Sequence, residues 1–205
     1  MDVYGIMLAA GSSSRMNDSF PKLTLPFRQK PLLWWSLKAA LKSNLKSVLL
    51  VVGANKNRVL YGIKNIGGEN KFRLVENENW EIGRSSSVTC GLRELPKNAS
   101  HVMFLQGDQP LIGVDLINRV IEYAVKNPES PMLYPSLKGK KANPVVFSKE
   151  GLIELSKIEG DTSGFGLSDK FNKRAVSFEL EDNSTQLNIN TNSDYRKLIE
   201  NYEKE

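Results

Sequence analysis

Short apolar runs alternate along the chain with longer stretches in which apolar residues recur at helical spacing. The runs predict strands and the stretches predict amphipathic helices. The expected strands are 3–8, 47–53, 72–75, 101–105, 131–134, 144–147 and 175–180, and the expected helices are 31–43, 55–65, 84–95, 114–126, 149–157 and 192–203. This order is typical of an α/β fold in which helices wrap a mostly parallel sheet.

The run "SVLLVVG" (47–53) shows no alternation of apolar and polar residues. A strand in a parallel sheet is covered on both faces, so a uniformly apolar pattern is expected of it. Sheets of this kind bind ligands beyond the carboxyl ends of their strands. We expect one domain over residues 1–205, with an insertion at about 131–180, where strand signals crowd together and the regular alternation lapses.

Length and composition narrow the class of protein. The chain of 205 residues is long enough to bury a large core. No apolar stretch reaches the length of a membrane helix, and the N-terminus lacks the pattern of a secretion signal, so we expect a cytoplasmic protein without a membrane partner. The single cysteine, Cys90, excludes an internal disulfide and a cysteine-based zinc site.

Positive charge is concentrated in the first part of the chain. Residues 1–75 hold twelve Lys/Arg and three Asp/Glu, while the whole chain carries a net charge of +5. A basic region can serve either a nucleic acid or a phosphate-rich small molecule. Most of these lysines lie at helical spacing opposite apolar residues and without interleaved aromatics, which favours a solvated helix face over a nucleic-acid surface.

The first expected strand ends in a run of small residues, "LAAGSSSRM" (8–16), and "PKL" (21–23) follows. Short side chains allow successive backbone N–H groups to approach an anion closely, as in phosphate cradles. Arg15 offers a planar fork of donors for phosphate oxygens, and Lys22 offers a point charge. The chain contains neither G-x-x-x-x-G-K-[ST] nor G-x-G-x-x-G. The alternative to a phosphate-binding loop is a Ser-rich surface turn.

These two motifs resemble the signature of nucleotidyltransferases, which activate a phosphorylated acceptor with a nucleoside triphosphate and release pyrophosphate. The chain is most similar to the molybdenum cofactor cytidylyltransferases of the glycosyltransferase-A-like superfamily. The similarity continues through "GRSSSVTCGL" (83–92), "LQGDQP" (105–110), "NPVVF" (143–147), "EGDTSG" (159–164) and "NINTNSD" (188–194). It implies a Rossmann-like three-layer sandwich of the nucleotide-diphospho-sugar transferase type.

The resemblance also assigns roles around the first loop. It implies that the triphosphate is bound by Leu8, Ala9, Ala10, Gly11, Ser12, Ser13 and Ser14. Arg15 would stabilise the leaving pyrophosphate, and Lys22 would lie against the transferred phosphoryl group. Holding two anions together requires such cations and fixed donors, because the phosphates repel one another.

A metal site is expected at Asp108, which follows an apolar strand in "LQGDQP". One carboxylate with phosphate oxygens and waters suffices for Mg²⁺, although a Gly-Asp turn is the alternative. The resemblance implies a second ligand in an Asp-Ile-Asp-Thr stretch, where this chain has "NINT" (188–191). The amide oxygen of Asn190 can contact Mg²⁺ but carries no full charge. Four interpretations therefore stay open: weaker metal binding, compensation by Asp194 or another carboxylate, reduced or lost activity, and a simple helix cap.

The resemblance implies that Gly83 and Ser87 contact the base and the ribose, while a serine N-cap of helix 84–95 is the alternative for the neighbouring serines. Relatives that transfer guanylyl groups tend to have Gly-Gly where this chain has Ala9 and Ala10. The alanine methyl favours the smaller pyrimidine, and therefore CTP, by about 1–3 kcal/mol.

On the acceptor side, "ANPVVF" and "EGDTSG" match stretches that face the pterin in the cytidylyltransferases. By this resemblance, Asn143 would bind the edge of the heterocycle and Asp161 would accept a hydrogen bond from a pterin amine. A turn before a strand and a loop between helices are the corresponding structural alternatives.

We therefore expect an Mg²⁺-dependent enzyme that transfers CMP from CTP to the phosphate of a molybdopterin-type cofactor. A molybdoenzyme is the partner that such a product implies. The alternatives are a guanylyltransferase, an NTP transferase with another phosphorylated acceptor, and a non-catalytic nucleotide- or cofactor-binding chaperone, which the missing aspartate at 190 favours. Isoprenoid cytidylyltransferases usually carry a His-Asp-Ala-Ala-Arg-Pro-like stretch in place of "LQGDQP". The hypothesis that the protein binds nucleic acid is supported by net charge alone.

Overall fold

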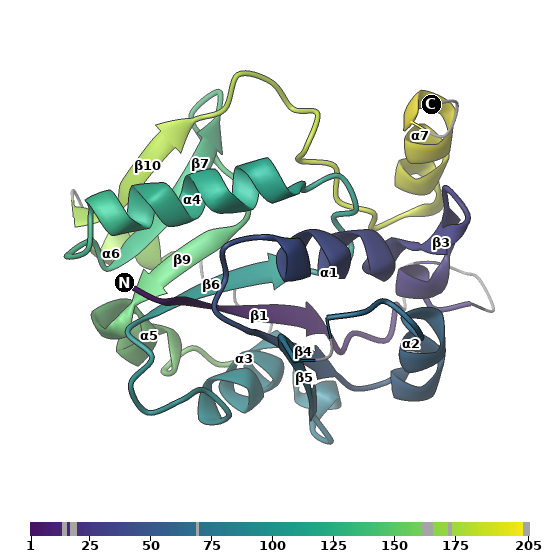
Figure 1. The fold of residues 1–205 in the computed structure, drawn as a ribbon, viewed down its shortest axis with the longest axis horizontal. Coiled ribbons are helices and arrows are strands. Elements are labelled where there is room, and N and C mark those ends of the chain that lie inside the picture. Colours follow the sequence, from purple (N-terminus) through teal and green to yellow (C-terminus); the bar gives the residue numbers. More distant parts are fainter. Residues whose placement is uncertain (14–15, 17–19, 69, 161–165, 172–173, 203–205) are drawn as a thin grey trace.

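The computed structural model describes residues 1–13, 16, 20–68, 70–160, 166–171 and 174–202 (Figure 1). Ser14 and Arg15, which the sequence assigns to the triphosphate and the pyrophosphate, lie outside the described residues. So does Asp161, assigned to the acceptor. Among the described residues, none of the helices combines the length and the apolar character needed to cross a bilayer.

The main sheet has the strand order β10-β7-β9-β6-β1-β4-β5, with the short β8 paired to β7. The strands are β1 (Val3–Ala9), β4 (Val48–Val52), β5 (Phe72–Glu76), β6 (His101–Gln106), β7 (Met132–Leu137), β8 (Lys140–Lys141), β9 (Val145–Ser148) and β10 (Val176–Glu179). β1 runs parallel to both β4 and β6, and β5 continues the parallel half beyond β4. β10 is parallel to β7, while β9 is antiparallel to both of its neighbours.

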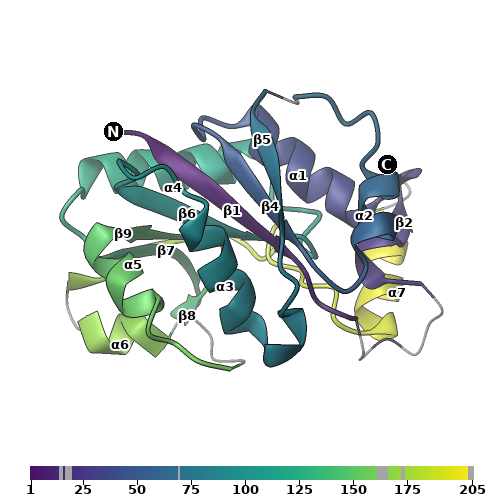
Figure 2. The same cartoon turned by 90° about the horizontal axis from the view of Figure 1, so that it is seen from below.

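Helices cover both faces of this sheet. They are α1 (Leu32–Lys42), α2 (Lys56–Gly62), α3 (Arg84–Arg93), α4 (Val114–Lys126), α5 (Lys149–Leu155), α6 (Leu167–Phe171) and α7 (Asn192–Tyr202). In Figure 2, α1 and α4 lie on one side of the strands and α3, α5 and α6 lie on the other. The predicted three-layer arrangement around a mostly parallel sheet is therefore confirmed.

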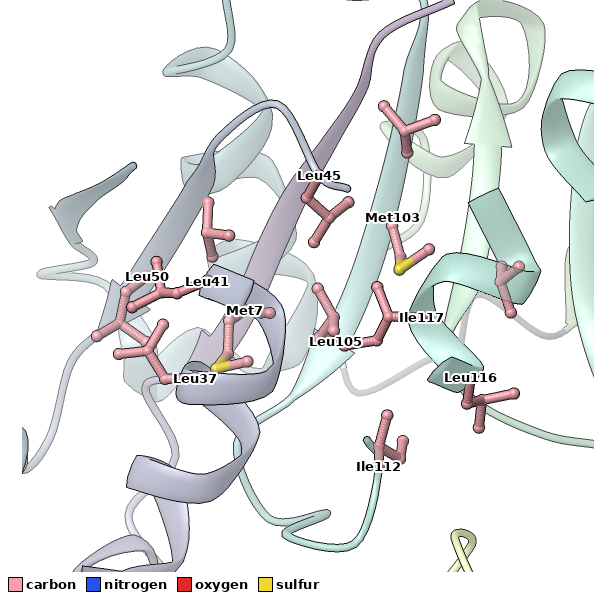
Figure 3. Packing of buried hydrophobic residues seen from close by; sticks show 14 of the residues in the cluster. Met7, Leu37, Leu41, Leu45, Leu50, Met103, Leu105, Ile112, Leu116 and Ile117 are labelled. Atoms are coloured by element: carbon pink, nitrogen blue, oxygen red, sulfur yellow. The ribbon is translucent and has the colours of Figure 1, made fainter. Parts of the chain in front are cut away.

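The larger core lies between the sheet and helices α1, α2 and α4. Met7 and Leu105 of the central strands are buried against Leu37 of α1 and Ile117 of α4 (Figure 3). The opposite face is buried by α3, α5 and α6, which pack against Ile6 and its neighbours. Because β1 is buried on both faces, it is a fixed base for the loop that follows it.

The segment 131–180 adds β7, β9 and β10 to the same sheet. Its middle strand, β9, pairs antiparallel with β6 and β7, so no crossover helix separates it from β7. The lapse in the strand-helix alternation that the sequence shows here reflects this local change to antiparallel pairing.

A third apolar cluster attaches the C-terminal helix beyond the sheet. Leu198 of α7 and Ile189 pack against Phe27 of the hairpin β2 (Pro26–Phe27) and β3 (Lys30–Pro31). Both α7 and the hairpin lie on the side toward which the arrowhead of β1 points (Figure 1). The backbone N–H of Ile189 donates to the carbonyl of Asp108 at 3.0 Å, which holds this C-terminal segment at the end of β6.

Candidate active site

A pocket of about 660 Å³ opens at the carboxyl ends of β1 and β6. Its walls come from the loop after β1, from the start of α3, from the turn after β6 and from the segment before α7. All but one of the described residues that the sequence assigns to a site line this pocket: Leu8, Ala9, Ala10, Gly11, Ser12, Ser13, Lys22, Gly83, Ser87, Asp108 and Asn190. The exception is Asn143.

The loop after β1 is shaped by Ser13, whose backbone lies in the left-handed region with φ 63°. Few residues other than glycine adopt this conformation. The Ser13 hydroxyl oxygen accepts the backbone N–H of Lys22 at 3.1 Å, and its carbonyl accepts the N–H of Met16 at 3.0 Å. The small-residue loop is thereby closed onto the start of the 3-10 helix η1 (Lys22–Thr24).

Gly53, directly after β4, supports the same loop from outside. The backbone N–H of Ala54 donates to the carbonyl of Ala10 at 3.2 Å. A Cβ on Gly53 would lie 2.8 Å from the Cβ of Trp80 and 2.9 Å from the carbonyl oxygen of Ala10. Ala10 and Trp80 both line the pocket, so the absence of a side chain at Gly53 allows two of its walls to meet.

Three polar side chains that line the pocket contact one another. The ammonium Nζ of Lys22 donates to Oδ2 of Asp108 at 2.6 Å and to Oδ1 of Asn190 at 3.2 Å. The side chains of Lys22 and Asp108 are only 15% and 20% exposed. Asp108 and Asn190 lie 86 and 168 positions after Lys22 in the sequence, and the fold brings the three residues together.

The described residues contain no group of three or more His, Cys, Asp or Glu side chains placed to hold a metal ion. Asp108 and Asn190 nevertheless present oxygens to one cationic atom, Nζ of Lys22. Carboxylate and amide oxygens are the donors that Mg²⁺ takes from proteins, together with waters and substrate phosphates. The donor set therefore fits a hard divalent cation that phosphate oxygens help to hold.

Asp194, the carboxylate that could compensate for Asn190, is committed to the start of α7. Its Oδ2 accepts the backbone N–H groups of Asn190 and Thr191 at 3.0 and 2.9 Å, and the Thr191 hydroxyl at 2.9 Å. Burial acts to raise the pKa of Asp194, but the hydrogen bonds from Thr191 and Asn190 outweigh it and hold the pKa below the ordinary value of an aspartate. This carboxylate orients the backbone of Asn190.

We expect Asp194→Asn to destabilise the protein at neutral pH by about 0.3–1 kcal/mol, because the amide keeps an acceptor oxygen but loses the negative charge that favours the start of a helix. Thermal unfolding would show this as a fall in Tm of about 1–4 °C. Because the folded pKa of Asp194 is depressed, its contribution is complete above the unfolded pKa and is lost as pH falls through the folded pKa. The Tm difference from the wild type should therefore shrink below about pH 4. A constant difference from pH 7 to pH 3 would contradict this account.

The start of α3 forms another wall of the pocket, through Gly83, Arg84 and Ser87. Its N-cap is Gly83 (φ 121°) and no side chain caps it, so a serine N-cap is not what the structure shows. Ser87 is buried, and its hydroxyl oxygen accepts Nδ2 of Asn77 at 3.0 Å. The same Nδ2 donates to Ser86 at 2.8 Å. Asn77 orients this wall and was not predicted from the sequence.

Asn143, which is expected to face the acceptor, does not line this pocket. The backbone N–H of Asn143 donates to Oε1 of Gln186 at 3.2 Å, and Nε2 of Gln186 donates to the Asn143 carbonyl at 3.0 Å. Gln186, also missed from the sequence, thus fixes the backbone at Asn143. The start of "EGDTSG" does reach α3, because the N–H of Ser85 donates to the carbonyl of Gly160 at 2.9 Å.

Comparison with known proteins identifies relatives. The 2-C-methyl-D-erythritol 4-phosphate cytidylyltransferase of Prochlorococcus marinus is 34% identical over 119 residues, which cover 57% of this chain and 51% of that protein. The bifunctional protein GlmU of Caldanaerobacter subterraneus is 29% identical over 124 residues, which cover 60% of this chain and 26% of that protein. The chain thus spans about half the length of the first relative and about a quarter of the second.

Among solved structures, Rv0371c from Mycobacterium tuberculosis superposes with a TM-score of 0.81 at 24% identity, covering 97% of each chain. Another structure of that protein, in complex with manganese, gives a TM-score of 0.78 over 98% of this chain and 100% of that chain. These likenesses confirm the predicted nucleotide-diphospho-sugar transferase type of fold. A family model described as the MobA-like NTP transferase domain matches residues 5–175, most of the chain, including the loop after β1, α3 and Asp108. The chain therefore belongs to the MobA-like NTP transferase family.

Proposed function

We propose that this protein is a nucleotidyltransferase that transfers CMP from CTP to the phosphate of an acceptor and releases pyrophosphate. One observation carries the proposal: residues from four separate segments, each assigned to the nucleotide or the metal, line one pocket of about 660 Å³. That volume is within the range of ordinary ligand sites. The relatives named cytidylyltransferases support the choice of CTP.

In the proposed reaction, an oxygen of the acceptor phosphate attacks the α-phosphorus of CTP. The bond from that phosphorus to the bridging oxygen breaks, and pyrophosphate leaves with the electron pair. The backbone of Ala9 to Ser14 is proposed to hold the phosphates, and Lys22 is proposed to lie against the transferred phosphoryl group. Arg15 remains the residue proposed for the leaving pyrophosphate. These groups hold the two anions in line and balance the charge that develops between them.

Asp108 and Asn190 are proposed to hold Mg²⁺, which would neutralise phosphate charge in the pocket. The manganese complex of the similarly folded Rv0371c is consistent with a divalent cation. Gly83 and Ser87 are proposed to contact the base and the ribose, because they line the same pocket as these oxygens. Ala10, buried and lining the pocket, carries the methyl group that favours a pyrimidine.

The acceptor is proposed to be a phosphorylated pterin, as the resemblance of "ANPVVF" and "EGDTSG" implies, with Asn143 and Asp161 facing it. The curated relatives give a specific second candidate, because their names specify the sugar-alcohol phosphate 2-C-methyl-D-erythritol 4-phosphate. Release of pyrophosphate from CTP, measured with each acceptor in turn, distinguishes the two. Release with neither acceptor, despite tight binding of CTP, would favour a nucleotide-binding chaperone instead.

Binding of the nucleotide is tested by thermal unfolding with CTP, GTP, ATP and UTP, each with and without Mg²⁺. A ligand at a hundredfold excess over its Kd stabilises the folded state by about 2.7 kcal/mol. For a chain of this length, CTP with Mg²⁺ should raise Tm by roughly 5–10 °C, and GTP by less. The absence of any shift with all four triphosphates would remove the basis of the proposed function.

A further inference from the structure

We propose that the Lys22 ammonium and the divalent cation compete for the same two ligand oxygens, the side-chain oxygens of Asp108 and Asn190. Metal ions then bind weakly to the nucleotide-free protein. They bind tightly once triphosphate has drawn the lysine away. The release of the lysine by phosphate rests on the proposed function. The competition between Lys22 and the metal ion does not.

The competition follows from where Nζ of Lys22 lies. It is 2.6 Å from Oδ2 of Asp108 and 3.2 Å from Oδ1 of Asn190, so the cation already touches both proposed metal ligands. All three side chains line the pocket, and those of Lys22 and Asp108 are at least four-fifths buried. A metal ion ligated by both oxygens would take hydrogen-bond acceptors from Lys22 and stand beside its positive charge.

The charge balance of the cluster favours the lysine in the absence of nucleotide. Lys22 and Asp108 cancel, and Asn190 adds a dipole but no charge. A divalent cation therefore meets no net negative charge here until phosphate arrives. The resemblance leads one to expect an aspartate at position 190. With that aspartate the cluster would have a net charge of −1. Because this chain has Asn190 instead, Lys22 alone neutralises the negative charge of the cluster.

The backbone around Lys22 explains how phosphate could release it. The Lys22 N–H is fixed by the hydroxyl oxygen of Ser13 at 3.1 Å, and Ser13 belongs to the small-residue loop proposed to hold phosphates. The side chain can therefore turn from Asp108 toward that loop while its backbone stays in place. Phosphate oxygens would then accept the lysine's hydrogen bonds, and the freed Asp108 and Asn190 oxygens would be open to the metal.

The test measures Mn²⁺ binding to the nucleotide-free, full-length protein, from the electron paramagnetic resonance signal of free Mn²⁺. We expect Lys22→Met to bind Mn²⁺ about tenfold more tightly than the wild type, and Lys22→Gln to behave likewise. Lys46→Met is the matched control, because Lys46 forms an exposed ion pair with Asp2 at 3.4 Å at the amino end of β1. It removes the same charge far along the strand from the pocket. The double variant with Lys22→Met and Asp108→Asn should lose the gain.

A gain of less than fivefold over Lys46→Met in both Lys22 variants, with circular dichroism showing both folded, would overturn the proposal. So would a gain that survives Asp108→Asn. Failure of the proposed function has a different signature, which is the absence of a Tm shift with every triphosphate in the wild type. If Lys22→Met gains Mn²⁺ affinity while no triphosphate binds, the competition stands and the nucleotidyltransferase assignment fails.

Discussion

Replacement of Asp108 by alanine is expected to reduce pyrophosphate release from CTP by about a thousandfold, equivalent to ~4 kcal/mol of lost transition-state stabilisation. Asp108 supplies the one carboxylate in the cluster with Lys22 and Asn190, so its loss leaves an amide oxygen alone to hold a divalent cation. The measurement is the rate of pyrophosphate release at saturating CTP and Mg²⁺. It uses whichever phosphorylated acceptor supports turnover in the wild type.

The variant should remain folded, because the Asp108 side chain lines the pocket and belongs to neither core of the sheet. Asp2→Ala is the matched control: it also removes an aspartate paired with a lysine, but at the exposed start of β1. We expect full activity from the control and an unchanged circular dichroism spectrum from both proteins. Near-normal turnover in Asp108→Ala would exclude this residue from the metal site.

The main elements of the fold were predictable because burial leaves a simple record in the sequence. The uniformly apolar pattern of 48–52 predicts a strand covered on both faces, and β4 is buried throughout. The end of β7 was placed less well, since the strand continues through the mixed residues of 135–137. Two-residue strands such as β2, β3 and β8 are too short to show any periodicity, so they were not predicted from the sequence.

Part of the site was predictable because of where its residues stand relative to the strands. The small-residue loop follows β1 and Asp108 follows β6, and adjacent parallel strands end at one edge of the sheet. The place of Asn190 came only from the resemblance. Its position depends on the packing of α7 against the β2–β3 hairpin, which no local pattern reveals.

The supporting residues that were missed share a signal that was available. Gly53 follows β4 and Asn77 follows β5, so both stand at carboxyl ends of parallel strands, as the loop and Asp108 do. Neither carries the charge or the small-residue run that draws attention in a sequence. Their roles are indirect, because Asn77 orients serine hydroxyls of α3 and Gly53 leaves space between two pocket walls.

Gly53→Ala should therefore weaken nucleotide binding without adding any group to the pocket itself. The new methyl group would lie 2.9 Å from the Ala10 carbonyl oxygen and 2.8 Å from the Trp80 Cβ, and the first of these is backbone that cannot rotate away. Overpacking of this kind costs about 1–3 kcal/mol. We expect a Tm lower by about 2–12 °C and a CTP affinity about tenfold weaker, measured by calorimetry.

Gly113→Ala provides the matched control, because nothing lies within 4 Å of a Cβ built there. Gly113 is the N-cap of α4, so its replacement costs under about 1 kcal/mol and should leave CTP affinity unchanged. Loss of stability in Gly53→Ala with CTP affinity retained would mean that the Ala10 loop yields to the methyl group and still binds phosphate. Equal loss of affinity in both variants would show that the effect comes from general destabilisation. Weaker CTP binding in Gly53→Ala alone would establish that the end of β4 holds the loop after β1 in its binding shape.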